Sequence, residues 1–82
     1  MIRRPRPIDW SQIVRDLEAA GMTQREIGSQ CDTNQPWVNR LKNIPGTEPK
    51  FEDGARLISV WTNRLARPAA EVPRESTHTE TT

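Results

Sequence analysis

The middle of the chain carries two short apolar periodicities with turn-forming residues between them. Ile27 and Cys31 lie four residues apart, which places both side chains on one face of a helix. Val38 and Leu41 lie three residues apart and mark one face of a second helix. Residues 32–34 are Asp-Thr-Asn, which suit a turn and a helix cap. The pattern predicts two helices joined by a tight turn, and such a pair can place its second helix in a DNA major groove.

Capping signals extend this prediction to four helices in a compact all-α fold. Asp9 followed by Gln12, and Thr23 followed by Glu26, have the spacing of N-terminal capping boxes. Gly21 suits the left-handed residue that ends a helix. The chain has no strand pattern and no internal repeat. The predicted domain covers residues 9–66, with helices at about 9–21, 23–31, 34–44 and 50–66.

The last predicted helix carries many apolar residues, and their spacing predicts which side faces the core. Its expected buried stripe is Phe51, Ala55, Ile58, Trp61 and Leu65, with Leu57 at the edge. Glu52 and Asp53 in the first turn and Arg64 in the last turn have the signs that the helix dipole favours.

With 82 residues, the chain is long enough for one small domain with a limited core. No apolar run approaches the roughly 20 residues of a membrane span, and we expect no membrane contact and no signal peptide. Cys31 is the only cysteine and is expected to be a buried hydrophobic residue, and His78 is the only histidine. We therefore expect no metal, cofactor, small-molecule ligand or catalytic site.

The net charge of +1 is unevenly distributed along the chain. Residues 1–8 carry Arg3, Arg4 and Arg6 without an acid and are expected to form a flexible basic arm. An arm of this kind can enter a DNA groove, and its alternative role is that of a solubilising tail. Residues 67–82 are rich in Pro and Thr and are expected to be a disordered tail.

Two segments resemble the helix-turn-helix of phage repressors of the lambda repressor and Cro type. They are residues 23–28, Thr-Gln-Arg-Glu-Ile-Gly, and residues 34–41, Asn-Gln-Pro-Trp-Val-Asn-Arg-Leu. Residues 49–58 also resemble the entry into the fourth helix of small phage-encoded members. The resemblance implies a domain of four to five helices that binds double-stranded DNA as a Cro-like phage or prophage repressor. It also implies a cytoplasmic, nucleoid-associated protein of a bacterial or phage-infected cell.

Three residues depart from the family pattern. Gly28 stands where the family prefers alanine, and it still permits a close approach of the two helices. Asp32 stands where glycine is usual, and aspartate tolerates the left-handed conformation better than most residues do. Thr33 replaces an apolar turn residue. These changes are compatible with the motif.

The resemblance also implies which residues contact DNA, because positions early in the third helix reach base edges in this family. By position, the base contacts are Gln35, Pro36, Asn39 and Arg40. Gln and Asn can bond bidentately to adenine and Arg to guanine, which fits this assignment. The expected contacts to the DNA backbone are Thr23, Gln24, Asn34, Lys42, Asn43 and Lys50. For Thr23, the alternative is a helix cap without a DNA contact. For the base-contact candidates and the two lysines, the alternative is an ordinary solvated side chain.

The sequence leaves alternatives for the role of Trp37, for the dimer surface and for the function. Trp37 can complete the core or touch DNA, and we expect partial burial. A single helix reads few base pairs, so we expect a homodimer on a palindromic operator, with half-sites about 34 Å or a multiple of that apart. The first candidate for the dimer surface is the fourth helix, with Leu57, Val60 or Trp61. The alternative function is a protein-interaction module such as an antitoxin or adaptor, although a polar outward side of the third helix favours DNA.

Overall fold

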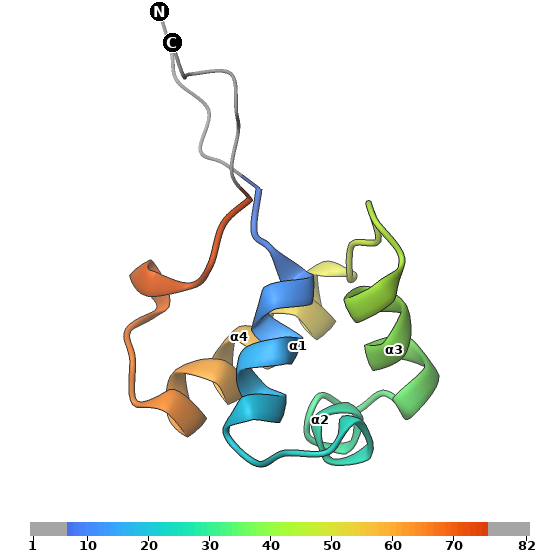
Figure 1. The fold of residues 1–82 in the computed structure, drawn as a ribbon, viewed down its shortest axis with the longest axis horizontal. Coiled ribbons are helices and arrows are strands. Elements are labelled where there is room, and N and C mark those ends of the chain that lie inside the picture. Colours follow the sequence, from blue (N-terminus) through green and yellow to red (C-terminus); the bar gives the residue numbers. More distant parts are fainter. Residues whose placement is uncertain (1–6, 76–82) are drawn as a thin grey trace, which may run out of the picture.

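A computed structural model describes residues 7–75, which form four α-helices and one 3-10 turn without any strand (Figure 1). The elements are α1 (Trp10–Ala19), α2 (Gln24–Gln30), α3 (Gln35–Asn43), α4 (Phe51–Leu65) and η1 (Ala69–Glu71). The predicted all-α fold is confirmed for this part of the chain. Each helix lies inside its predicted range, because those ranges included the capping residues. The predicted arm residues Arg3, Arg4 and Arg6 and the segment 76–82 lie outside the described residues.

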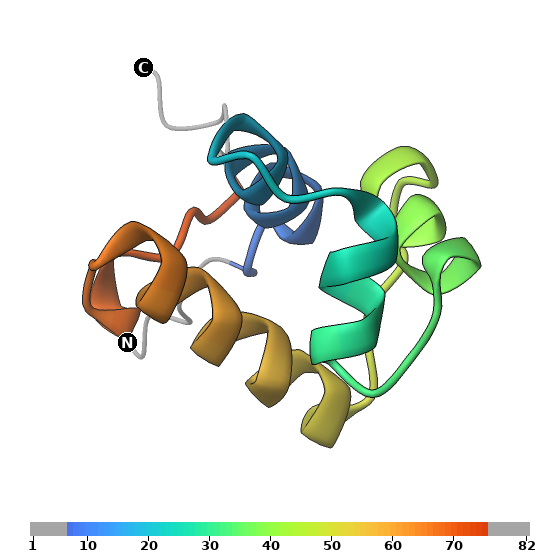
Figure 2. The same cartoon turned by 90° about the horizontal axis from the view of Figure 1, so that it is seen from below.

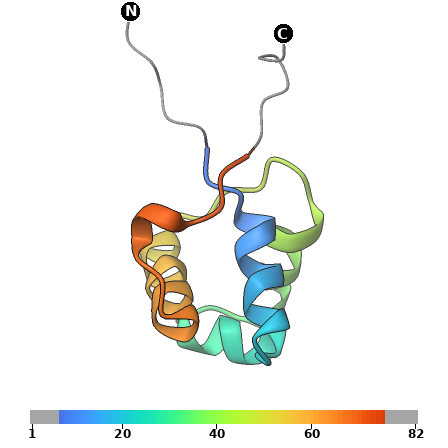
Figure 3. The ribbon, with the colours of Figure 1, turned by 60° about the vertical axis from the view of Figure 1, so that its left-hand side comes forward.

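α1 is the central helix, with α3 packed on one side and α4 on the other (Figures 1 and 3). α2 lies across one end of the molecule and contacts all three other helices (Figure 2). The side chains that meet between the helices are apolar. The fully buried ones are Ile13, Val14, Leu17, Ile27, Cys31, Val38, Leu57 and Trp61. Among the helices of the described residues, none is long and apolar enough for a membrane crossing.

The predicted capping interactions are present. The carboxylate of Asp9 accepts a hydrogen bond from the backbone N–H of Gln12 at 3.0 Å. Thr23 and Glu26 form a reciprocal capping box, in which each side chain accepts from the other residue's backbone N–H at 3.1 and 2.8 Å. Gly21 has a φ of +96°, which confirms the left-handed turn after α1. These short-range signals fix where α1 and α2 begin.

The predicted buried stripe of α4 is confirmed for Trp61, and Ile58 and Leu65 are partly buried against the core, but it is wrong for Phe51 and Ala55. Leu57 and Trp61 are fully buried and Val60 is 8 % exposed, whereas Phe51 is 88 % exposed. The helix is therefore rotated relative to the prediction. Trp61 belongs to both the predicted and the observed buried side, and its indole N–H donates to the carboxylate of Asp16 at 3.0 Å. The same result removes Leu57, Val60 and Trp61 as candidates for a dimer surface, because all three lie in the core.

The expectation of disorder from residue 67 onward does not hold for residues 67–75. This segment returns along α4 towards the start of α1 (Figure 3). Val72 is 6 % exposed and joins the core. Ile8 and Arg74 form an antiparallel bridge, with backbone hydrogen bonds of 2.9 and 2.8 Å on either side of it. One buried apolar side chain and these backbone bonds hold a segment that its composition marks as disordered.

Candidate nucleic-acid interface

The turn between α2 and α3 is held by local contacts. Asp32 has a φ of +62°, which confirms the left-handed conformation expected of it. The carbonyl oxygen of Gly28 accepts two hydrogen bonds from Thr33, one from the backbone N–H at 2.8 Å and one from the hydroxyl at 3.3 Å. A Cβ atom on Gly28 would lie 2.7 Å from the carbonyl carbon of Asn34, so a glycine is required there. The turn therefore sets α3 against α2 in one fixed arrangement.

α3 has one apolar side and one polar side. Val38 is fully buried and Leu41 is 2 % exposed, and both pack into the core. The side chain of Asn34 caps the helix by accepting from the backbone N–H of Trp37 at 3.0 Å. The residues predicted to read bases are all exposed, namely Gln35, Pro36, Asn39 and Arg40. The core contacts of Val38 and Leu41 therefore hold the exposed polar side of α3 in place.

Trp37 lies at the flank of this surface. It is half-buried and packs against the core, as the sequence predicted. Trp37 also lines a shallow hollow between α3 and the loop that leads into α4, together with Arg40 and Lys50. This hollow places an aromatic ring and two cations beside the exposed side of α3. Glu48 and Asp53 lie at the same hollow, so its charge is mixed.

Two residues predicted to bind phosphate share a partner within the domain. The ammonium group of Lys42 lies 2.8 Å from a carboxylate oxygen of Glu18, and the amide of Gln24 donates to the other oxygen at 3.1 Å. The Lys42 side chain is the main cause that lowers the pKa of the Glu18 carboxyl, against the opposing effect of desolvation. Glu18 lies in the last turn of α1, where the helix dipole disfavours an acid, and this position is the sequence signal for a cation partner.

The other predicted backbone contacts fall into two groups. The side-chain oxygens of Thr23 and Asn34 already accept hydrogen bonds at the starts of α2 and α3. Asn43 and Lys50 are exposed at the end of α3 and just before α4. Only the second pair therefore presents side chains without a capping role.

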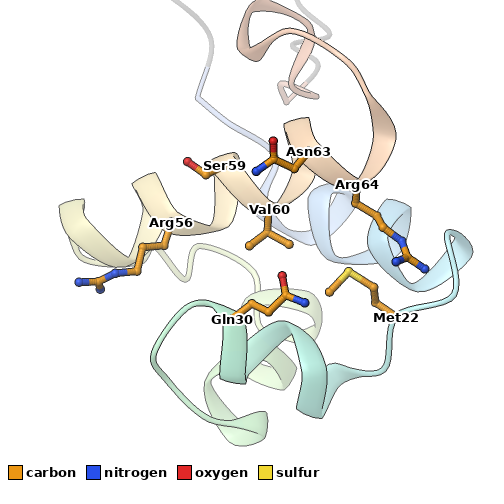
Figure 4. A pocket seen from close by; sticks show the side chains of 7 residues that line it. All are labelled: Met22, Gln30, Arg56, Ser59, Val60, Asn63 and Arg64. Atoms are coloured by element: carbon orange, nitrogen blue, oxygen red, sulfur yellow. The ribbon is translucent and has the colours of Figure 1, made fainter.

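A separate hollow lies between α2 and α4 (Figure 4). Two of its lining groups are guanidinium groups that already have partners. Arg64 donates to the carbonyl oxygen of Ala20 at 2.7 Å, and Arg56 pairs with Asp53 at 3.1 Å. The remaining lining residues are Met22, Gln30, Ser59, Val60 and Asn63. Across residues 7–75, no group of three or more His, Cys, Asp or Glu residues is placed to hold a metal ion.

Comparisons with known proteins give one partial likeness. No family model matches the chain, and no solved structure matches it. The chain is 30 % identical over 67 residues to the DNA mismatch repair protein MutS of Geobacillus kaustophilus (strain HTA426). This match covers 82 % of the chain but only 7 % of MutS, so the chain spans a small part of this relative. The likeness does not indicate a repressor-type helix-turn-helix.

Proposed function

We propose that this protein binds double-stranded DNA sequence-specifically through α3 in the major groove, as a small transcriptional regulator of the lambda repressor and Cro type. The observation that carries this proposal is the outward chemistry of α3. Gln35, Asn39 and Arg40 are exposed on one side of the helix, while Val38 and Leu41 hold the other side in the core. Amide and guanidinium groups are the side chains that read adenine and guanine edges bidentately.

The arrangement of α2 and α3 supports the same proposal. A reading helix must keep its angle to the domain, or its side chains miss the base edges. The close approach at Gly28, the left-handed Asp32 and the two hydrogen bonds from Thr33 supply that rigidity. The similar protein is also named for DNA, as a DNA mismatch repair protein, although the matched region is 7 % of its length.

Backbone contacts would come from the ends of the reading helix. Asn43 and Lys50 are exposed at one end, and Arg25 is exposed near the start of α2. The cations Lys50 and Arg25 and the amide of Asn43 fit the phosphate contacts that fix a domain's register on DNA. The arm with Arg3, Arg4 and Arg6 would add charge along a neighbouring groove. In this proposal a Cro-like repressor of phage or prophage origin binds a palindromic operator as a homodimer, and its concentration sets operator occupancy.

The competing proposal is a protein-interaction module such as an antitoxin or adaptor. One observation favours it: the 88 % exposed side chain of Phe51 marks an apolar surface at the start of α4. That surface lies on α4 and not on the outward side of α3, which is polar. Both functions can therefore coexist, with DNA on α3 and a protein contact on α4.

Selection from a pool of randomised DNA duplexes tests the proposed function. We expect the full chain to enrich a short motif, and fluorescence anisotropy with the enriched duplex to report its affinity. Gln35→Ala and Arg40→Ala should each weaken binding by about 5-fold to 150-fold, the loss expected for one bidentate base contact. Asn63→Ala and Arg67→Ala are matched controls, because they remove an amide and a guanidinium from exposed positions away from α3.

The controls should bind like the parent chain. Failure to enrich any motif would reject sequence-specific binding. Equal affinities for Gln35→Ala, Arg40→Ala and the two controls would reject α3 as the reading helix.

A further inference from the structure

Phe51 is the most exposed large apolar side chain among residues 7–75, at 88 %. It stands at the first position of α4 and lines one side of a hollow there. The lining of this hollow is almost wholly apolar. It includes Ile8, Trp10, Pro49, Ala55 and Ile58. A projecting aromatic ring and an apolar hollow therefore lie next to each other on one surface.

We infer that this surface is a homodimer interface, in which Phe51 of each copy packs into the hollow of the other. A two-fold axis makes the same patch serve as both partners, so a projection and a receiving hollow must lie together on one chain. The Phe51 surface meets that requirement. A phenylalanine buries about 150–250 Å² when it is fully covered, which gives each copy a substantial anchor.

The charges around Phe51 are also self-complementary. Lys50 and Glu52 flank it in the chain, have opposite signs and are both exposed. Within the described residues neither side chain has an ion-pair partner. A two-fold axis near Phe51 brings Lys50 of one copy towards Glu52 of the second copy, and the reverse. An apolar centre with such a polar rim is the usual layout of a specific interface.

This dimer leaves the base-reading side of α3 free, and of the proposed phosphate contacts it takes only Lys50, which would pair with Glu52 of the second copy. α3 and α4 lie on opposite sides of α1 (Figure 3). Gln35, Asn39 and Arg40 contribute nothing to the Phe51 surface. A second copy of the chain is the partner that a palindromic operator requires. The dimer itself does not depend on DNA binding and can be measured without DNA.

Sedimentation equilibrium of the full chain without DNA tests the inference. The parent chain should show a reversible monomer–dimer equilibrium. Phe51→Ala should raise the dimer dissociation constant at least about 100-fold, because both copies lose a central anchor. Ile44→Ala is the control, since Ile44 is the other exposed large apolar residue, at 52 %, and lies outside the hollow.

At protein concentrations well below the dimer dissociation constant of the parent, thermal unfolding followed by circular dichroism should be the same for Phe51→Ala and the parent, because the exposed ring adds little to the monomer. A parent chain that stays monomeric at all concentrations would overturn the inference. So would a Phe51→Ala variant that dimerises as the Ile44→Ala control does.

Charge reversal tests the two-fold arrangement. Lys50→Glu and Glu52→Lys should each weaken the dimer several-fold, because each places like charges opposite one another in both symmetric contacts. The double variant Lys50→Glu/Glu52→Lys should restore the dimer, since every contact again joins opposite charges. Failure of the double variant to dimerise better than the single variants would overturn the arrangement.

Discussion

Gly28 lies where α2 passes closest to the backbone at the start of α3. In an exposed helix, alanine would be more favourable than glycine by about 1 kcal/mol. Here an added Cβ would meet the carbonyl carbon and oxygen of Asn34 at 2.7 and 2.8 Å. Backbone atoms cannot swing aside as a flexible side chain can, and overpacking of this kind costs about 1–3 kcal/mol. The steric cost therefore outweighs the gain in helix propensity.

Gly28→Ala should lower the free energy of unfolding by up to about 2 kcal/mol, since a gain in helix propensity of about 1 kcal/mol offsets part of the steric cost. Urea denaturation followed by circular dichroism measures the change. Ser29→Ala is the control, because Ser29 is the next residue on α2, is exposed, and gains helix propensity without a clash. A Gly28→Ala variant as stable as the parent would mean that α2 and α3 can separate slightly at no cost.

At the scale of elements, Glu18 joins three helices. It belongs to α1 and binds Gln24 at the start of α2 and Lys42 near the end of α3. Because Lys42 favours the charged carboxylate, the pKa of Glu18 is lower in the folded chain than in the unfolded one. The ion pair therefore stabilises the fold above the unfolded pKa, and this contribution is lost as pH falls through the folded pKa.

Glu18→Gln should reduce stability at neutral pH and make no difference in strong acid, where the parent carboxyl is protonated as well. Urea midpoints of the two chains across a pH series measure this convergence. Glu48→Gln is the matched control, because Glu48 is exposed and has no ion-pair partner within the described residues. If the Glu18→Gln and parent midpoints differ equally at every pH, the ion pair is not the cause.

For the whole molecule, the segment after α4 closes the core. Val72 lies in the core cluster, and backbone hydrogen bonds join residues 73–75 to residues 7–9. Burial of one valine is worth about 1.5–3 kcal/mol, a large share of the stability of a small domain. The last described turn of the chain is therefore part of the fold.

Deletion of residues 67–82 should lower the free energy of unfolding by about 2 kcal/mol or more, because it uncovers the core. Deletion of residues 76–82 is the control, since it leaves Val72 and the bridge between Ile8 and Arg74 in place. Thermal melts of the two truncated chains make the comparison. Identical melting temperatures would show that the segment adds no stability.

Local signals were enough to predict where helices begin and which side of α3 is buried. Asp9, Thr23 and Gly21 act through contacts within a few residues, which the sequence displays directly. The orientation of α4 could not be found this way, because that helix has two apolar stripes. The packing of Leu57 and Val60 against residues of the other helices, which the sequence does not display, decides which stripe turns inward.

The polar contacts of the candidate site likewise could not be predicted from the sequence. Glu18 and Lys42 are 24 residues apart, and only the packing of α1 on α3 brings them to 2.8 Å. Composition also failed for residues 67–75, where one buried valine outweighs the effect of two prolines. The outward residues of α3 were predictable, because their exposure follows from helical spacing once Val38 and Leu41 are assigned to the core.

The bridge between Ile8 and Arg74 brings the two ends of the described chain together, with the N–H of Glu75 2.8 Å from the carbonyl oxygen of Pro7 (Figure 3). A domain with adjacent ends tolerates circular permutation, and it can be spliced into a surface loop of a host protein without stretching either backbone. Residues 7–75 could therefore be inserted into another protein as one folded unit, and α3 would keep its structure in the resulting chimera.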